Sequence, residues 1–71
     1  MNEHEQFTQT IANNIRATVR AMRRDQCLGA SVRCLAANTP TPRTGPDLTP
    51  AEYADLFAAV ARQTVPNFLT D

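Results

Sequence analysis

Apolar side chains recur at helical spacing over the first third of the chain. On a wheel of 100° per residue they fall within about 80° of one another, which is typical of a helix with one face turned to a core. Polar residues fill the other positions. We therefore expect a helix over residues 3–25 whose core face is formed by Phe7, Ile11, Ile15, Thr18 and Met22.

The start of this first helix carries a capping signal. Asn2 is suited to the N-cap, with Glu5 at the third helical position. Glu3 and Glu5 near the start, and arginines near the end, also complement the helix dipole.

The stretch DQCLGASVRCLAAN that follows does not extend the first pattern. If the helix continued, Leu28, Val32 and Leu35 would lie rotated away from the first apolar stripe. Gly29 costs roughly 1 kcal/mol relative to alanine inside a helix. We expect a break near residues 25–29 and a second, short helix over 29–37.

Prolines then interrupt regular structure. Four of them fall in residues 40–50, interleaved with threonines. Proline excludes helix interior and central strand, so residues 38–49 should form an extended joint.

The last helix has the clearest start signal. In TPAE, Thr49 is an N-cap, Pro50 takes the first helical position and Glu52 completes a capping box. Leu48 and Tyr53 are spaced as a hydrophobic staple. The helix should span residues 50–64 and end before Pro66. Its expected apolar face consists of Tyr53, Leu56, Phe57, Val60, Ala61 and Thr64.

These elements predict a small all-α domain spanning residues 1–71. Helices 3–25 and 50–64 are expected to pack antiparallel, with the short helix and the joint between them. The tail 65–71 holds Phe68 and Leu69, which either fold onto the core or contact a partner. A core of this size gives little stability, so a dimer or a tight complex is expected.

The charges are balanced overall but unevenly distributed. Net charge is zero, which argues against bulk attraction to nucleic acid or membrane. Residues 1–15 carry −2, residues 16–43 carry +5 and residues 44–71 carry −3. The first residues do not resemble a secretory signal, and no apolar run is long enough for a membrane span. We therefore expect a cytoplasmic protein with no membrane partner.

Residues that could carry catalysis or bind metal are few. Cys27 and Cys34 would lie about 10.5 Å apart on a continuous helix, so two free thiols are favoured over a disulfide or a metal site. Ser31 in GASVR lacks the second glycine of a nucleophile elbow and the sheet that would carry it. His4 has no evident partner as a general base. We expect no enzyme activity, no cofactor and no metal.

The stretch RATVRAMRR at residues 16–24 holds four of the seven arginines, and the chain has no lysine. On the wheel they span about 100°, opposite the apolar stripe. One interpretation is a solvated face, partly paired with Glu52 or Asp55. The other is a recognition face, because arginine forks bind carboxylates and phosphates with two hydrogen bonds. This arginine face consists of Arg16, Arg20, Arg23 and Arg24.

The functional hypothesis is a small, non-catalytic binding protein of the inhibitor or adaptor type. Its expected partner is a protein with an acidic surface. A phage or bacterial modulator of a host machine would have this character. Two alternatives remain: a nucleic-acid-binding accessory protein that uses the same arginines, and a structural subunit of a homo-oligomer such as a homodimer.

Overall fold

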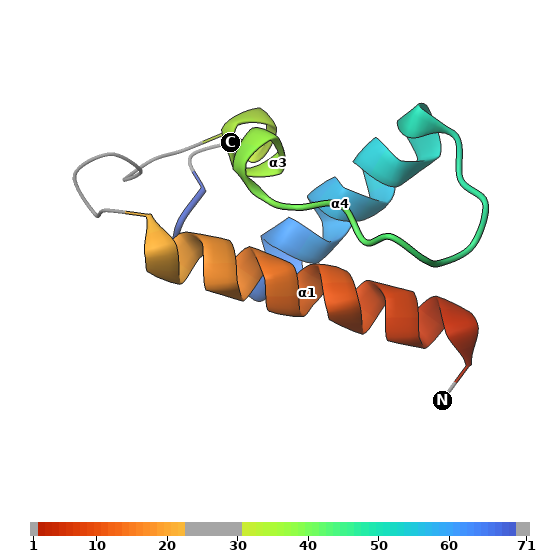
Figure 1. Ribbon diagram of the computed structural model, residues 1–71. Coiled ribbons are helices and arrows are strands. Elements are labelled where there is room, and N and C mark those ends of the chain that lie inside the picture. The colour runs from red at the N-terminus through yellow and green to blue at the C-terminus, as the bar shows by residue number, and fades with distance from the viewer. Residues whose placement is uncertain (1, 23–30, 70–71) are drawn as a thin grey trace.

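Three helices make up the computed structural model of this chain, which describes residues 2–22 and 31–69 (Figure 1). Helix α1 is Glu3–Ala21, α3 is Val32–Asn38 and α4 is Pro50–Thr64. None of the described residues forms a strand. The two long helices pack against each other and against the short one, which confirms the small all-α fold.

The capping signals act as the sequence predicts. Asn2 Oδ1 accepts a hydrogen bond from the Glu5 backbone N–H at 2.7 Å. Thr49 Oγ1 accepts one from the Glu52 N–H at 3.1 Å, and the Thr49 N–H donates to Glu52 Oε1 at 3.0 Å. Both long helices therefore begin with a backbone N–H satisfied by a side chain, and α4 has the predicted bounds.

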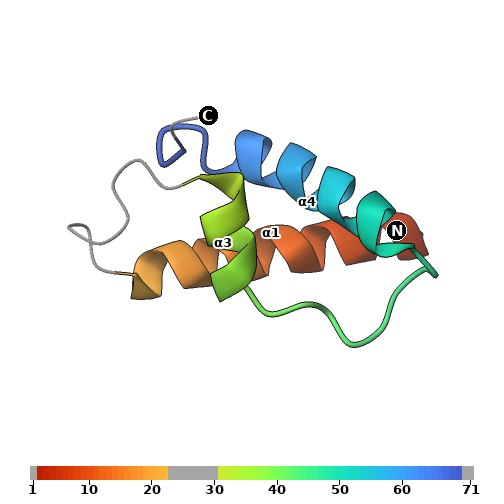
Figure 2. The same ribbon diagram turned by 90° about the horizontal axis from the view of Figure 1, so that it is seen from above.

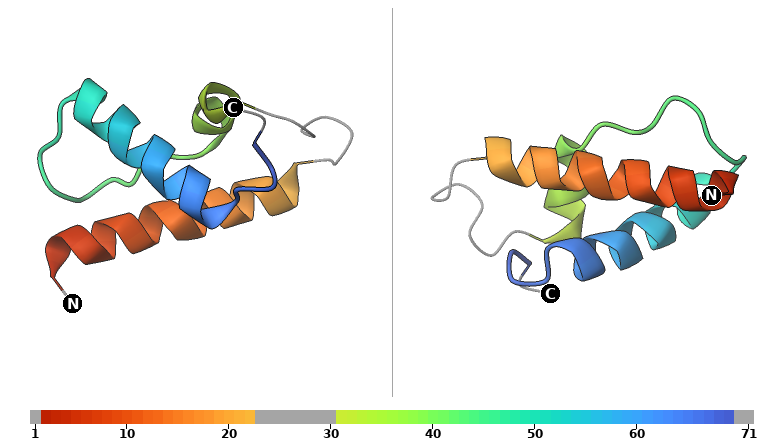
Figure 3. Two further views of the ribbon diagram at one scale, coloured as in Figure 1. Left: turned by 180° about the vertical axis from the view of Figure 1, so that it is seen from behind. Right: turned by 90° about the horizontal axis from the view of Figure 1, so that it is seen from below.

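The relative direction of the two long helices is not the expected one. In the views of Figures 1 to 3, α1 and α4 run the same way along the molecule. Phe7 and Tyr53, each near the start of its helix, pack edge to face with ring centroids 6.3 Å apart. The antiparallel prediction was wrong because residues 39–49 run back to the start of α1 before α4 begins.

Two contacts of the proline joint trace this return path. The Asn14 side-chain amide donates to the carbonyl oxygen of Pro40 at 3.4 Å. Further along, Gly45 lies directly against the ring of Phe7. The joint thus passes along α1 towards its N-terminal end. Helix α4 begins there and runs in the same direction as α1.

Helices α1 and α3 differ from the predicted bounds at their ends. Met22 has extended backbone (φ −76°, ψ 140°), so α1 ends at Ala21 and not at residue 25. Ser31 Oγ accepts from the Cys34 N–H at 3.1 Å, and this cap delays α3 to Val32. The expected break at residues 25–29 lies outside the described residues.

One core joins the three helices. Leu35 of α3 is fully buried, and Thr39 just beyond that helix is also buried, with its hydroxyl donating to the Leu35 carbonyl oxygen at 2.8 Å. Thr18 and Met22, predicted for the core face of α1, are only half-buried. The buried apolar residues are Phe7, Ile11, Ala12 and Ile15 of α1, Leu35 of α3, and Phe57, Val60 and Ala61 of α4.

Candidate binding site

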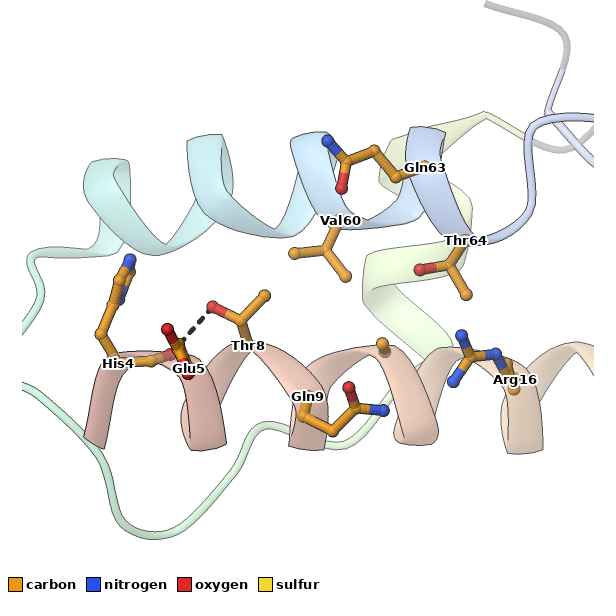
Figure 4. A pocket seen from close by; sticks show the side chains of 9 residues that line it. His4, Glu5, Thr8, Gln9, Arg16, Val60, Gln63 and Thr64 are labelled. Atoms are coloured by element: carbon orange, nitrogen blue, oxygen red, sulfur yellow. Dashed lines mark hydrogen bonds between the residues drawn. The ribbon is translucent and has the colours of Figure 1, made fainter. Parts of the chain in front are cut away.

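An open groove of about 600 Å³ runs between α1 and α4. Figure 4 shows side chains of both helices reaching towards it. We call it the α1–α4 groove, and its lining residues are His4, Glu5, Thr8, Gln9, Ala12 and Arg16 of α1 with Val60, Gln63 and Thr64 of α4.

The groove has a small apolar floor and a polar rim. Ala12 and Val60 are only 8% and 5% exposed, so they leave a shallow apolar strip. On the rim, the Thr8 hydroxyl donates to the His4 carbonyl oxygen at 3.0 Å, within α1 itself. The rim therefore offers polar groups that another molecule could reach, over a floor of small side chains.

Opposite charges occupy the two ends of this groove. Glu5 lies in the first turn of α1 and Arg16 lies eleven residues further along the same helix. Both side chains are exposed. The Arg16 guanidinium donates one hydrogen bond, to Asn13 Oδ1 at 3.2 Å, which leaves most of its donors free of protein partners within the described residues.

The arginine face is described only in part. Arg16 and Arg20 are exposed on the second half of α1, whereas Arg23 and Arg24 lie outside the described residues. Within residues 2–22 and 31–69, no arginine nitrogen approaches a carboxylate oxygen within 4.0 Å. The pairing with Glu52 or Asp55 considered from the sequence is therefore not found there.

The common direction of α1 and α4 explains this lack of pairing. Both helices carry their acidic first turns at one end of the molecule and a basic last turn at the other. The helix dipoles favour this placement of charge within each helix. We call the acidic residues in the first halves of these two helices the acidic end (Glu3, Glu5, Glu52 and Asp55) and the arginines in their second halves the basic end (Arg16, Arg20 and Arg62).

The other candidate residues have structural environments. The Ser31 hydroxyl serves as the α3 cap, and Cys34 is an exposed free thiol, while Cys27 lies outside the described residues. Phe68 and Leu69 are half-buried and pack against the core. The described residues hold no group of three or more histidine, cysteine or acidic side chains arranged for a metal ion. No helix among them has the length and apolar character needed to cross a bilayer.

Sequence reasoning missed the groove, although one signal for it was present. Residues eleven apart on a helix are separated by three turns and a remaining rotation of about 20°, so Glu5 and Arg16 share a face. Val60, Gln63 and Thr64 line the groove only because α4 runs in the direction of α1. The residue pattern of α1 does not indicate that direction.

Comparison of the chain with protein-family models, with curated proteins and with solved structures finds no match. The groove and the charged ends are therefore the basis on which a function can be assigned.

Proposed function

We propose that this chain is a non-catalytic protein that binds an acidic surface of another protein through its basic end. The observation that carries the proposal is the exposure of Arg16 and Arg20 without a carboxylate within 4.0 Å among the described residues. A guanidinium has five donors in a planar fork, and Arg16 uses one of them on Asn13. A partner carboxylate could accept the remaining donors two at a time.

An acidic protein suits this surface better than a nucleic acid does. Proteins that hold single-stranded nucleic acid commonly combine basic groups with exposed aromatic rings on which bases stack. In the described part of the chain, Phe7 and Phe57 are buried, and Tyr53 and Phe68 are half-buried. The zero net charge also gives no long-range attraction to phosphates.

The absence of catalysis is part of the same proposal. The Ser31 hydroxyl oxygen already accepts a hydrogen bond from the Cys34 N–H, and His4 is an exposed side chain at the start of α1. A nucleophile needs a base within hydrogen-bond reach, and no described hydrogen bond links Ser31 to a base. A stoichiometric inhibitor or adaptor needs only the surface.

Affinity capture tests the proposal with two matched variants. The chain is tagged and used to capture partners from its source cell, with half of each sample treated with nuclease. Arg16→Gln/Arg20→Gln removes two charges from the basic end. Arg33→Gln/Arg43→Gln removes two exposed arginines from α3 and the joint and serves as the control.

We expect a stoichiometric protein that survives nuclease, is retained by the control variant and is lost with Arg16→Gln/Arg20→Gln. Circular dichroism should show the same helix content in all three proteins. Equal loss of the captured partner with both variants, or loss of the captured partner after nuclease treatment, would contradict binding of an acidic protein at the basic end.

A further inference from the structure

The α1–α4 groove is electrostatically complementary to itself. Glu5 and Arg16 carry opposite charges, share one face of α1 and lie about 16 Å apart along its axis, on either side of the low floor at Ala12. A second α1 laid antiparallel on this face would place its own Arg16 opposite Glu5 and its own Glu5 opposite Arg16.

We propose that the chain forms a two-fold symmetric homodimer in which α1 of each copy lies antiparallel in the α1–α4 groove of the other. The inference goes beyond the proposed function, because it assigns a second copy of this chain to the groove. Arg20 is not among the groove residues and stays available to a different partner.

The two-fold axis sets which residues meet. In an antiparallel pair centred between Gln9 and Ala12, Glu5 faces Arg16 of the partner subunit and Gln9 faces Ala12 of the partner subunit. A two-fold interface repeats every contact, so two ion pairs form. The long Gln9 side chain then lies over the space that the small Ala12 side chain leaves open, one on each side of the axis.

Helix α4 completes the contact. Helix α4 supplies Val60 to the floor and Thr64 to the rim, so an incoming helix touches α1 and α4 together. Because α1 and α4 run the same way, one antiparallel helix opposes the dipoles of both. Zero net charge means that the two copies do not repel each other at long range.

The dimer would also add buried surface to a fold whose own core is small. Among the described residues, eight buried apolar side chains join the three helices, and folds of this size often rely on a partner subunit. A standard interface buries about 800 Å² on each partner, which here would be a substantial part of the 5138 Å² of exposed surface. The contact must therefore include the rims as well as the floor.

Two charge reversals that restore each other test this geometry. In Glu5→Arg the pairs become arginine against arginine, and in Arg16→Glu they become glutamate against glutamate. Each variant alone should associate at least about tenfold more weakly than the natural chain at low salt. An equimolar mixture of the two restores both ion pairs, and so does the double variant Glu5→Arg/Arg16→Glu.

Sedimentation velocity over a concentration series gives the readout. We expect a dimer for the natural chain, monomers for each single variant, and dimers for the mixture and for the double variant. Glu3→Arg and Arg20→Glu serve as controls, because neither residue lines the groove, and both should remain dimeric. Circular dichroism confirms that each variant keeps its helices.

A monomer at every concentration would overturn the proposal and leave the groove to a different molecule. Single variants that dimerise like the natural chain, or a mixture that stays monomeric, would also overturn it. The proposed function fails separately, because Arg20 does not line the groove. Arg20→Glu leaves the proposed dimer intact but reverses a charge of the basic end, so unchanged capture of the acidic partner by this dimeric variant would contradict the proposed function alone.

Discussion

At the scale of single residues, Gly45 lets the proline joint approach α1. Its φ of +158° lies outside the range that other residues adopt easily, and a Cβ at this position would overlap the ring of Phe7. Gly45→Ala should lower the free energy of unfolding by about 1–3 kcal/mol, because the ring has to move. Urea denaturation measures the loss. The same measurement on Thr44→Ala, an exposed neighbour, should show a change below about 0.5 kcal/mol.

Glu52 makes part of the stability depend on pH. The Thr49 backbone N–H, followed by the Thr49 hydroxyl, lowers the pKa of the Glu52 carboxyl below 4.5, against a small opposing effect of desolvation. A lowered pKa means that the folded state favours the ionised form. This stabilisation is complete above the unfolded-state pKa and is lost as the pH falls through the lower, folded-state pKa.

Glu52→Gln should therefore unfold at a lower temperature than the natural chain at neutral pH, and the difference should shrink as the pH falls below about 4.5. Thermal melts across this range measure the gap. Asp55→Asn is the control, since Asp55 is exposed and takes no part in the capping box. A gap of constant size across the range would show that the capping hydrogen bonds do not depend on the charge of Glu52.

At the scale of elements, α3 depends on one side chain for its position. The helix has seven residues, too few to be stable alone, and Leu35 is its only fully buried residue. Leu35→Ala should cost about 2–5 kcal/mol. Hydrogen exchange should show the α3 amides losing protection before those of α1 and α4, whereas Val32→Ala, at a half-buried position, should have a smaller effect. Uniform loss across all helices would show that α3 does not open as a separate unit.

The same elements show which parts of the structure the sequence specifies. The bounds of α4 were predictable because Thr49, Pro50 and Glu52 mark its start and Pro66 limits its end. The end of α1 had no such marker, since no glycine or proline lies near Ala21. The short helix was placed three residues early because Ser31 was weighed as a nucleophile and not as a cap.

The direction of α4 and the groove that depends on it were not predictable. Helical periodicity identifies the apolar face of each helix but carries no information on the path of the proline joint between them. That path is set by distant contacts such as those of Asn14 with Pro40 and of Gly45 with Phe7. The exposure of Arg16 and Arg20, in contrast, followed directly from their place opposite the apolar stripe.

At the scale of the whole molecule, α1 and α4 run the same way and so separate their own charges into an acidic and a basic end. Binding through such exposed charges weakens as salt screens them. We therefore expect capture of the acidic partner by the natural chain to fall as ionic strength rises, and capture through an apolar contact to persist. Pull-down at increasing salt distinguishes the two, and retention of the partner at high salt would contradict a role for the arginines.

The most direct test of this account is the direction of α1 relative to α4, because the charge separation and the groove both depend on it. Pairs of spin labels at Ala21 and Arg62, and at Ala21 and Ala54, in a background without Cys27 and Cys34, report two distances. Parallel helices predict that the Ala21–Arg62 distance is the shorter one, by up to about 12 Å, the rise over eight helical residues. A shorter Ala21–Ala54 distance would mean antiparallel helices and would contradict the account.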